Sequence, residues 1–241
     1  MSIPRFYLPE LTPTCELSKA DSVHASNVLR LSVGDAVEVF DGHGGFARAE
    51  ITQSNKRATL LELGEIQSDA SQSRFDLHVI VALPKGDRQK VLIDGLTQLG
   101  VSSVIPLICE RQVAQATEKS LERLRRGVIE SCKQCGRNRL MEIQSAKKIY
   151  ELVDDSKTAT CCFAHPYTLP GGSPVPISQL SMQPNSEAFV LIGPEGGLSE
   201  DECEQLHAAG WQNVSLGPHI LRIEMAAISS ASQCLGQVIS S

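Results

Sequence analysis

The sequence predicts an α/β protein in which a small β-barrel precedes a mostly parallel sheet with helices on both faces. Short strand-like runs joined by close turns fill the first part of the chain, and apolar runs that alternate with helical patterns follow from residue 75. The first pattern is typical of a small barrel, and the second of a parallel sheet buried on both faces. We therefore expect two domains, 1–70 and 74–241, joined by the polar segment 68–74.

The turn and capping residues place the individual elements. The barrel strands are expected at 6–8, 36–42, 45–53 and 58–66. The second domain is expected to contain strands at 75–83, 102–108, 159–164, 188–193 and 213–217, and helices at 87–99, 118–136, 200–209 and 224–239. Gly100 is expected to end the first of these helices. Ser199 and Glu202 form an S-x-x-E capping box that begins the third, and Gly210 can end it.

Composition excludes several classes of protein. No apolar run reaches the roughly 18 residues of a membrane span, and the first residues lack a basic start followed by an apolar run, so we expect a cytoplasmic protein with no membrane contact. The 8 cysteines include one C-x-x-C pair, Cys132 and Cys135, without a second pair at zinc-ligand spacing. We expect free, mostly buried thiols and no metal; a zinc or redox role is the alternative.

Charge is distributed unevenly although the net charge is only −6. Residues 76–150 contain 13 Lys and Arg against 8 Asp and Glu, a net charge of +5, whereas 1–75 carry −3 (7 against 10) and 151–241 carry −8 (2 against 10). Because salt confines such fields to about 10 Å, a basic region can bind a polyanion in an acidic protein.

The helix expected at 118–136 has two faces. At about 100° per residue, one face collects an apolar stripe and the other a basic stripe. The apolar stripe consists of Leu121, Leu124, Val128, Cys132 and Cys135, and the basic stripe of Lys119, Arg123, Arg126, Lys133 and Arg137. The basic stripe fits either a solvated surface or a contact with a polyanion.

Two Gly-Pro turns follow apolar strands near the C-terminus, in "LIGPEGGL" (191–198) and "LGPHILRIE" (216–224). Ligands bind at the carboxyl ends of parallel strands, and glycines allow close approach of the backbone. Neither segment is a G-x-G-x-x-G or Walker sequence, so a phosphate site is not indicated. The alternatives are a polar heterocycle read by backbone groups and two ordinary turns.

Three side chains near these turns are candidates for chemistry. Arg222 and Glu224 begin the last helix in a region almost without cations, so Arg222 either pairs with a nearby acid or stabilises an anion. His165, with Pro166, follows the strand at 159–164 and is either a turn residue or part of a site. No G-x-S-x-G or H-E-x-x-H motif supports a hydrolase.

Together with "QCGRNR" (134–139), "LGV" (99–101) and the N-terminal "IPRFY…VLRLSVGD", the two Gly-Pro segments resemble the bacterial 16S ribosomal RNA uracil-N3 methyltransferases of the SPOUT superfamily. The resemblance implies a C-terminal sheet with a trefoil knot, a rare exception to the rule against knots, and a PUA-like RNA-binding barrel. It implies S-adenosylmethionine as cofactor, 16S rRNA of the small ribosomal subunit as partner, and a homodimer.

The resemblance also implies site residues. The cofactor pocket would be lined by His165, Pro166, Leu191, Ile192, Gly193, Glu195, Gly196, Gly197, Leu216, Gly217, Ile220 and Leu221. RNA would contact Arg5, Arg30, Lys85, Arg88, Arg123, Arg126, Lys133, Arg137 and Arg139. Arg222 would stabilise charge on the uracil as N3 loses its proton, and Glu224 would orient Arg222 or accept the proton.

The chain departs from the family pattern at four positions. Gly95 and Gln98 stand where the pattern has a lysine and an acid, and Ile223 and Met225 stand where threonines are common. Three other functions remain open: another RNA specificity of the superfamily such as ribose 2′-O methylation, a non-catalytic RNA-binding module, and a nicotinamide oxidoreductase, against which the missing G-x-G-x-x-G speaks.

Overall fold

The computed structural model describes residues 3–55, 58–69, 75–112, 114–155, 159–165, 173–183 and 186–239. The chain forms two compact units. The first contains Met1–Gln72 and Ile129–Leu140, and the second contains Ser73–Val128 and Met141–Ser241. The segment 129–140 therefore packs with the first unit, although the sequence predicted a single division near residue 70.

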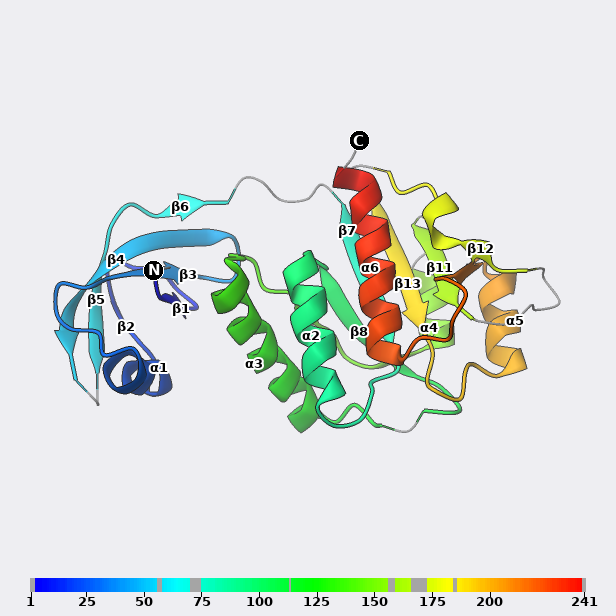
Figure 1. Ribbon diagram of the computed structural model, residues 1–241, viewed down its shortest axis with the longest axis horizontal. Helices are drawn as coiled ribbons and strands as arrows, with labels where there is room; N and C mark the ends of the chain where they lie inside the picture. Colours follow the sequence, from blue (N-terminus) through cyan, green and yellow to red (C-terminus); the bar gives the residue numbers. More distant parts are fainter. Residues whose placement is uncertain are drawn as a thin grey trace. The chain divides into compact units, whose positions relative to one another are not determined.

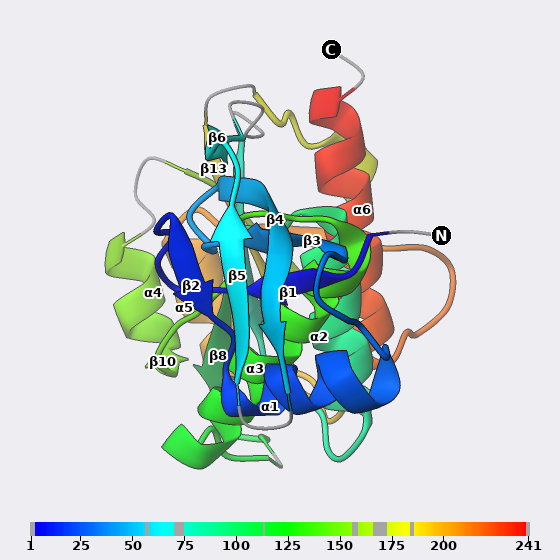
Figure 2. The same ribbon diagram turned by 90° about the vertical axis from the view of Figure 1, so that its left-hand side faces the viewer.

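The first unit is built on a curled, six-stranded sheet, which faces the viewer in Figure 2. Its strands are β1 (Arg5–Tyr7), β2 (Thr14–Glu16), β3 (Ala36–Phe40), β4 (Gly45–Ser54), β5 (Thr59–Leu63) and β6 (Gln67–Ser68), in the order β1-β3-β4-β5-β2 with β6 beside β4. The helix α1 (Lys19–Val23) and the π-helix η1 (His24–Val28) follow β2. In β4, buried Ala47, Ala49 and Ile51 alternate with exposed residues, as expected for a strand with one face in a core.

The second unit contains a parallel eight-stranded sheet. Its strands are β7 (Asp76–Val81), β8 (Ser103–Ile108), β9 (Glu142–Ile143), β10 (Lys147–Lys148), β11 (Thr160–Ala164), β12 (Val175–Pro176), β13 (Glu187–Ile192) and β14 (Gln212–Ser215), in the order β10-β8-β7-β13-β11-β14-β12 with β9 beside β8. Its helices are α2 (Arg88–Leu99), most of α3 (Glu118–Cys135), α4 (Ile149–Asp155), the 3-10 helix η2 (Ile177–Gln179), α5 (Glu200–Ala208) and α6 (Ile223–Ile239).

Helices cover both faces of this sheet. Figure 1 shows α2 and α6 side by side in front of β7 and β13, with which α6 packs. On the other side, Leu152 of α4 and Leu206 of α5 join a buried cluster with Ile80, Phe163 and Leu191 of the sheet. The residues of β7, β11 and β13 are therefore mostly apolar, because helices cover both faces of the sheet.

The predicted sequence of main elements is confirmed, with boundaries that differ by one to a few residues. The elements that the sequence analysis missed are short: β2, α1, η1, β6, β9, β10, α4, β12 and η2. The capping box of Ser199 and Glu202 is present, and Gly100 ends α2 in the left-handed conformation. Short elements carry too few residues to show a period, which explains why they were not predicted.

The cysteine prediction is confirmed in part. All eight cysteines are free thiols, and half of them are buried. Cys132 lies in the apolar stripe of α3 as predicted, but the predicted packing role of Cys135 is wrong. Cys135 is the last residue of α3 and is exposed, because the helix ends beyond the core that the stripe covers.

Two further features concern the described residues as a whole. Within these residues, no three His, Cys, Asp or Glu side chains come close enough together to hold a metal ion. None of the helices in the described ranges combines the length and the apolar character needed to cross a membrane.

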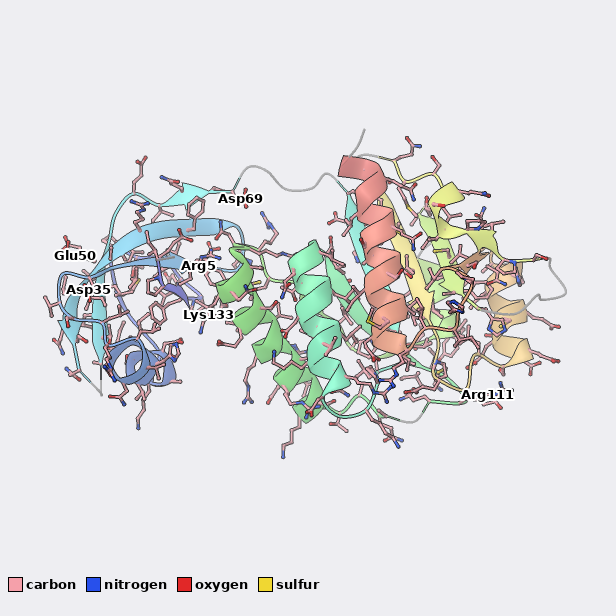
Figure 3. All side chains as sticks on the ribbon, in the orientation of Figure 1. Arg5, Asp35, Glu50, Asp69, Arg111 and Lys133 are labelled. Carbon is pink, nitrogen blue, oxygen red and sulfur yellow. The ribbon has the colours of Figure 1, made fainter. Side chains whose placement is uncertain are left out.

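The last turn of α3 is tied to the strands of the first unit by Arg5. Its guanidinium donates to Glu38 Oε1 at 2.6 Å, to the carbonyl oxygen of Cys132 at 2.9 Å, and to Asn138 Oδ1. It also lies 4.9 Å from the centre of the Phe40 ring, a cation–π contact. Figure 3 shows Arg5 beside this end of α3. The "QCGRNR" segment thus belongs structurally to the N-terminal unit.

Gly100 offers a test of the helix end. Gly100→Ala should lower the free energy of unfolding by about 1 kcal/mol, because φ is 93° and an alanine is strained there. Gly236→Ala in α6 is the matched control: no atom lies within 4 Å of its added Cβ, so it should stabilise by roughly 0.5–1 kcal/mol. Urea unfolding followed by fluorescence of the single tryptophan, Trp211, reports on this unit. Equal effects of the two substitutions would contradict the strain argument.

Candidate active site

A cavity of about 530 Å³ lies where three neighbouring parallel strands end. The strands β13, β11 and β14 are adjacent, so the segments that follow them meet at one edge of the sheet. Ile192–Glu200, His165 and Leu216–Leu221 supply most of the lining. The cavity has the size of small-molecule sites, and its walls combine backbone groups with apolar side chains such as Leu198 and Ile223.

The first Gly-Pro loop is a tight turn that leads directly into α5, and the start of α5 is joined to the loop after β8. The amide of Gly197, where φ is 71°, donates to the carbonyl oxygen of Pro194 at 2.9 Å. The capping box follows directly, with Ser199 N donating to Glu202 Oε2 at 2.8 Å. The other oxygen of Glu202 accepts from the amide of Glu110 at 2.8 Å. Glu202 therefore joins the start of α5 to the loop after β8.

Arg111, in that loop, is the cation of the cavity wall. Its Nη1 donates to the carbonyl oxygen of Gly196 at 3.0 Å, although the side chain is largely exposed. The imidazole of His165, which also lines the cavity, is buried. Burial lowers the pKa of His165, and the charge of Arg111 lowers it further. The wall thus presents a cationic guanidinium together with a neutral imidazole at neutral pH.

Thiols beside the cavity are not nucleophiles. Burial raises the pKa of Cys109 to about 12 and that of Cys203 to about 11, and in both the charge of Glu202 adds to this effect. Because the thiolate is the reactive form, both side chains remain inert thiols near neutral pH. Covalent catalysis by cysteine has no support at this site.

The turn from Leu221 to Glu224 ends the second Gly-Pro loop and begins α6. Arg222 is exposed, and within the described residues no ion pair joins it to Glu224. The Glu224 side chain is only 7% exposed, its Oε2 has no hydrogen-bond partner among the described residues, and that oxygen lies 3.9 Å from Arg88 Nη1. The same Nη1 lies 2.9 Å from Glu195 Oε1. Arg88, and not Arg222, is therefore the cation paired with Glu224.

Most predicted cofactor residues do meet at this cavity. The lining includes His165, Ile192, Gly193, Glu195, Gly196, Gly197, Leu216, Gly217, Ile220 and Leu221. Leu191 lies instead in the core beneath it, fully buried, because its side chain points to the face covered by α4 and α5. Pro166 falls outside the described residues. Arg222 and Glu224 stand at the margin, next to lining residues.

The sequence analysis missed Arg111 and other parts of the wall. The lining residues not predicted are Arg111, Ala164, Pro194, Leu198, Glu200, Val214, Ser215, Pro218, His219, Ile223 and Ala226. Arg111 follows a buried parallel strand, at the same edge of the sheet as the glycine turns. The sequence signal that could have identified Arg111 is a cation directly after an apolar strand, at the edge of the sheet where ligands bind. The contact between Arg111 and Gly196 joins residues 85 apart in the chain, which no local pattern reveals.

The residues predicted to contact RNA fall into two groups. Arg5, Lys133 and Arg88 are engaged within the protein: Lys133 bonds Asp21 at 2.8 Å and Glu130 at 2.9 Å, and its side chain is 16% exposed. The others are more accessible, although Arg123 donates to Gln89 Oε1 and Arg126 lies 3.7 Å from Glu122. Arg30, Lys85, Arg123 and Arg126 are exposed, and Arg137 and Arg139 are half-buried.

The four departures from the family pattern have different surroundings. Gly95 faces Ile228 of α6, whose Cδ1 would lie 2.5 Å from an added Cβ, so α2 and α6 touch closely there. Gln98 is exposed. Ile223 lines the cavity, and Met225 is 49% exposed on the first turn of α6. None of the four positions interrupts the backbone walls of the cavity.

Fold and cavity define a class of protein, and comparisons with known proteins agree. The RNA methyltransferase domain family matches residues 71–235, and the RNA methyltransferase PUA domain family matches residues 17–63. The predicted fold class, a SPOUT-type α/β domain preceded by a PUA-like β-domain, is confirmed. The chain belongs to this RNA methyltransferase family and, within it, to the family of ribosomal RNA small subunit methyltransferase E.

Individual relatives cover nearly the whole chain. Ribosomal RNA small subunit methyltransferase E of Rickettsia conorii is 33% identical over 90% of this chain and 88% of its own, and that of Bacillus subtilis is 27% identical over 92% and 90%. Among solved structures, the Neisseria gonorrhoeae enzyme of that name, bound to S-adenosylmethionine, has a TM-score of 0.85 at 30% identity and 96% coverage of both chains. A Legionella pneumophila protein in complex with the same cofactor has a TM-score of 0.89 at 28% identity and 98% coverage of both chains.

The proximity of Arg111 and His165 can be tested by titration. Arg111→Gln should raise the pKa of His165, because one of the two effects that lower it is removed, while Arg111→Lys should leave it nearly unchanged. Histidine NMR signals, assigned with His165→Gln, give the value. An unchanged pKa in the glutamine variant would show that the guanidinium does not act on the imidazole.

The same pKa has a consequence for stability. The unfolded chain takes up this proton more readily, so the folded state loses stability as pH falls from the ordinary value of 6.5 through the lowered pKa. The loss should be smaller in Arg111→Gln. Urea unfolding of both proteins at several pH values between 7.5 and about 5 measures the difference.

Proposed function

We propose that the protein is an S-adenosylmethionine-dependent methyltransferase that methylates N3 of a uridine in the 16S rRNA of the small ribosomal subunit. One observation carries this proposal: the two Gly-Pro loops form one cavity, and the buried carboxylate of Glu224 stands beside it with one oxygen, Oε2, that has no hydrogen-bond partner among the described residues. A cavity walled by backbone groups suits a nucleoside, and a carboxylate with a free oxygen suits removal of a proton. The family and the cofactor-bound relatives support the same reaction.

The residues present fit this cofactor. The turns at 193–197 and 216–221 offer backbone polar groups, and Leu198, Leu216 and Ile223 offer apolar surface for a flat adenine ring. The cavity wall also carries Arg111, a guanidinium of the kind that binds a carboxylate such as that of the cofactor. When bound, S-adenosylmethionine supplies a methyl group on a positively charged sulfur.

The chain's own residues would act on the uracil. Glu224, in the first turn of α6, accepts the N3 proton through its Oε2 oxygen. As the proton leaves, negative charge spreads to the carbonyl oxygens beside N3, and the exposed guanidinium of Arg222 stabilises it. The base must be unpaired to reach these groups, at a cost of a few kcal/mol.

The two units would have different roles. We assign RNA binding to the N-terminal unit, predicted as residues 1–70, together with exposed cations of the basic middle of the chain, and we assign catalysis to the unit predicted as 74–241. The exposed cations Arg30, Lys85, Arg123 and Arg126, with Arg137 and Arg139, are the RNA contacts that remain in this proposal. An enzyme with this substrate works in the cytoplasm.

A homodimer is also part of the proposal. The first turns of α2 and α6 lie side by side, since Arg88 of one pairs with Glu224 of the other. Val91 and Met225 on these turns are 50% and 49% exposed, and Ile220 beside them is 73% exposed. A second copy packed on this apolar surface would remove it from water and would lie next to the cavity.

Arg222→Ala tests the catalytic assignment. The substitution should lower kcat about 100-fold or more, because the charge that forms on the uracil loses its stabilising group. Binding of S-adenosylmethionine, measured by calorimetry, should change little. Transfer of labelled methyl to small subunits that lack the modification measures turnover, and mass spectrometry of the nucleosides shows whether the product is N3-methyluridine. A ribose-methylated product would replace the proposed specificity, and near-normal turnover of the variant would refute the role of Arg222.

Arg126→Gln and Lys133→Gln test the RNA surface on one helix. Arg126 is 77% exposed, so its loss should weaken RNA binding and reduce the slope of log K against log salt by about 1. Lys133 is held by two carboxylates, so its loss should lower the unfolding midpoint without changing that slope. Binding of a 16S rRNA fragment at several salt concentrations distinguishes them. If Lys133→Gln and not Arg126→Gln reduced the salt slope, Lys133 and not Arg126 would be the RNA contact.

A further inference from the structure

Arg88 begins α2 and connects two other parts of the methyltransferase unit. Its Nη1 lies 2.9 Å from Glu195 Oε1, in the first Gly-Pro loop, and 3.9 Å from Glu224 Oε2, in the first turn of α6. Its side chain is 32% exposed, so water screens these ion pairs only in part. One guanidinium thus joins the loop that forms a wall of the cavity to the carboxylate at its margin.

Glu224 depends on this cation. A carboxylate that is 7% exposed is costly to keep ionised unless a positive charge lies near it. Among the described residues, Arg88 is the ion-pair partner that Glu224 has. The separation of 3.9 Å is an ion pair and not a hydrogen bond, so the Oε2 oxygen keeps its capacity to accept a proton.

Glu195 supplies the second half of the connection. Its pair with Arg88 is short, and it fixes the guanidinium between the two carboxylates. Because Glu195 lines the cavity, any movement of the 193–198 loop on ligand binding also moves the partner of Arg88. The position of Arg88 relative to Glu224 is therefore sensitive to the state of the cavity.

These contacts argue against the predicted role of Arg88 as an RNA contact. A phosphate would have to compete with two carboxylates that already share the guanidinium. The exposed cations Lys85 and Lys90 lie nearby in the sequence, and within the described residues Lys90 pairs with Asp94, one turn along α2.

We propose that Arg88 is a positioning residue of methyl transfer and not an RNA contact. Its guanidinium fixes the position of the Glu224 carboxylate relative to the 193–198 loop that contains Glu195. This inference rests on the proposed function, in which Glu224 accepts the N3 proton. Arg88 lies in the basic segment 76–150, for which the sequence predicts RNA contacts, so the inference distinguishes a positioning cation from the RNA-binding cations of the same segment.

The experiment compares Arg88→Gln and Arg88→Lys with Lys90→Gln, which removes the same charge two residues away on α2. For each protein, kcat is measured at saturating S-adenosylmethionine with small subunits that lack the modification. Affinity for a 16S rRNA fragment and its salt slope are measured in parallel. Arg88→Gln should lower kcat about 10- to 100-fold, because Glu224 is no longer held in place, while the salt slope stays as in the unaltered protein. Arg88→Lys should restore part of the rate, and Lys90→Gln should behave as the unaltered protein.

Two results would overturn the proposal. One is a kcat of Arg88→Gln within about twofold of the unaltered protein, which is the normal scatter of a surface substitution. The other is a loss of RNA affinity with a salt slope reduced by about 1, which marks a phosphate contact. If Arg88→Gln does not fold, Arg88→Lys and Glu195→Gln replace it, and a kcat unchanged in both would equally overturn the inference.

A second measurement separates this inference from the proposed function. If the unaltered protein transfers no methyl group to the small subunit, the proposed function fails. The Glu195–Arg88 connection is then judged by calorimetric binding of S-adenosylmethionine to Glu195→Gln, Arg88→Gln and the double variant. If Glu195 and Arg88 act through one interaction, the double variant should lose no more affinity for S-adenosylmethionine than either single variant. Additive losses would show that the two residues act separately.

Discussion

The parallel pairing of β13 with β11 and of β11 with β14 is the constraint on which the site depends. Parallel neighbours end at the same edge, so the segments after Ile192, Ala164 and Ser215 meet there although they are far apart in the chain. Helices cover both faces of the sheet, so the side chains of these strands pack on both sides, and close packing opposes any shift of one strand along its neighbour. The cavity therefore depends on the register of these three strands.

Contacts between distant segments then give this edge its shape. Glu202 holds the start of α5 and the loop after β8 with its two oxygens, and Arg111 in that loop reaches the carbonyl oxygen of Gly196. Arg88 joins the Gly-Pro loop to α6 from the other side. Each connection involves a charged group, and such bonds are stronger than those between neutral partners. The loops are thus held individually, and the cavity does not rely on apolar packing alone.

Much of this arrangement could be predicted from the sequence. The main strands and helices have clear periods and caps, and the two Gly-Pro segments contain most of the residues that line the cavity. What could not be predicted depends on long-range pairing. The sequence suggested that Glu224 orients Arg222 or accepts the proton. In the structure Arg222 precedes α6 and is exposed, whereas the Glu224 side chain is buried, and Arg88, 136 positions earlier, is its ion-pair partner among the described residues. Likewise the sequence predicts RNA contacts at Arg5 and Lys133, whereas in the structure these side chains pair with Glu38 and Asp21, which lie far away in the sequence.

The close approach of α2 and α6 at Gly95 has an evolutionary consequence. The two helices that carry Arg88 and Glu224 meet where one has no side chain and the other has Ile228. A side chain at position 95, such as the lysine of the family pattern, would require the Ile228 side chain to shift, because an added Cβ would lie 2.5 Å from its Cδ1. Positions 95 and 228 should therefore covary across the family, with bulk on one helix exchanged for bulk on the other.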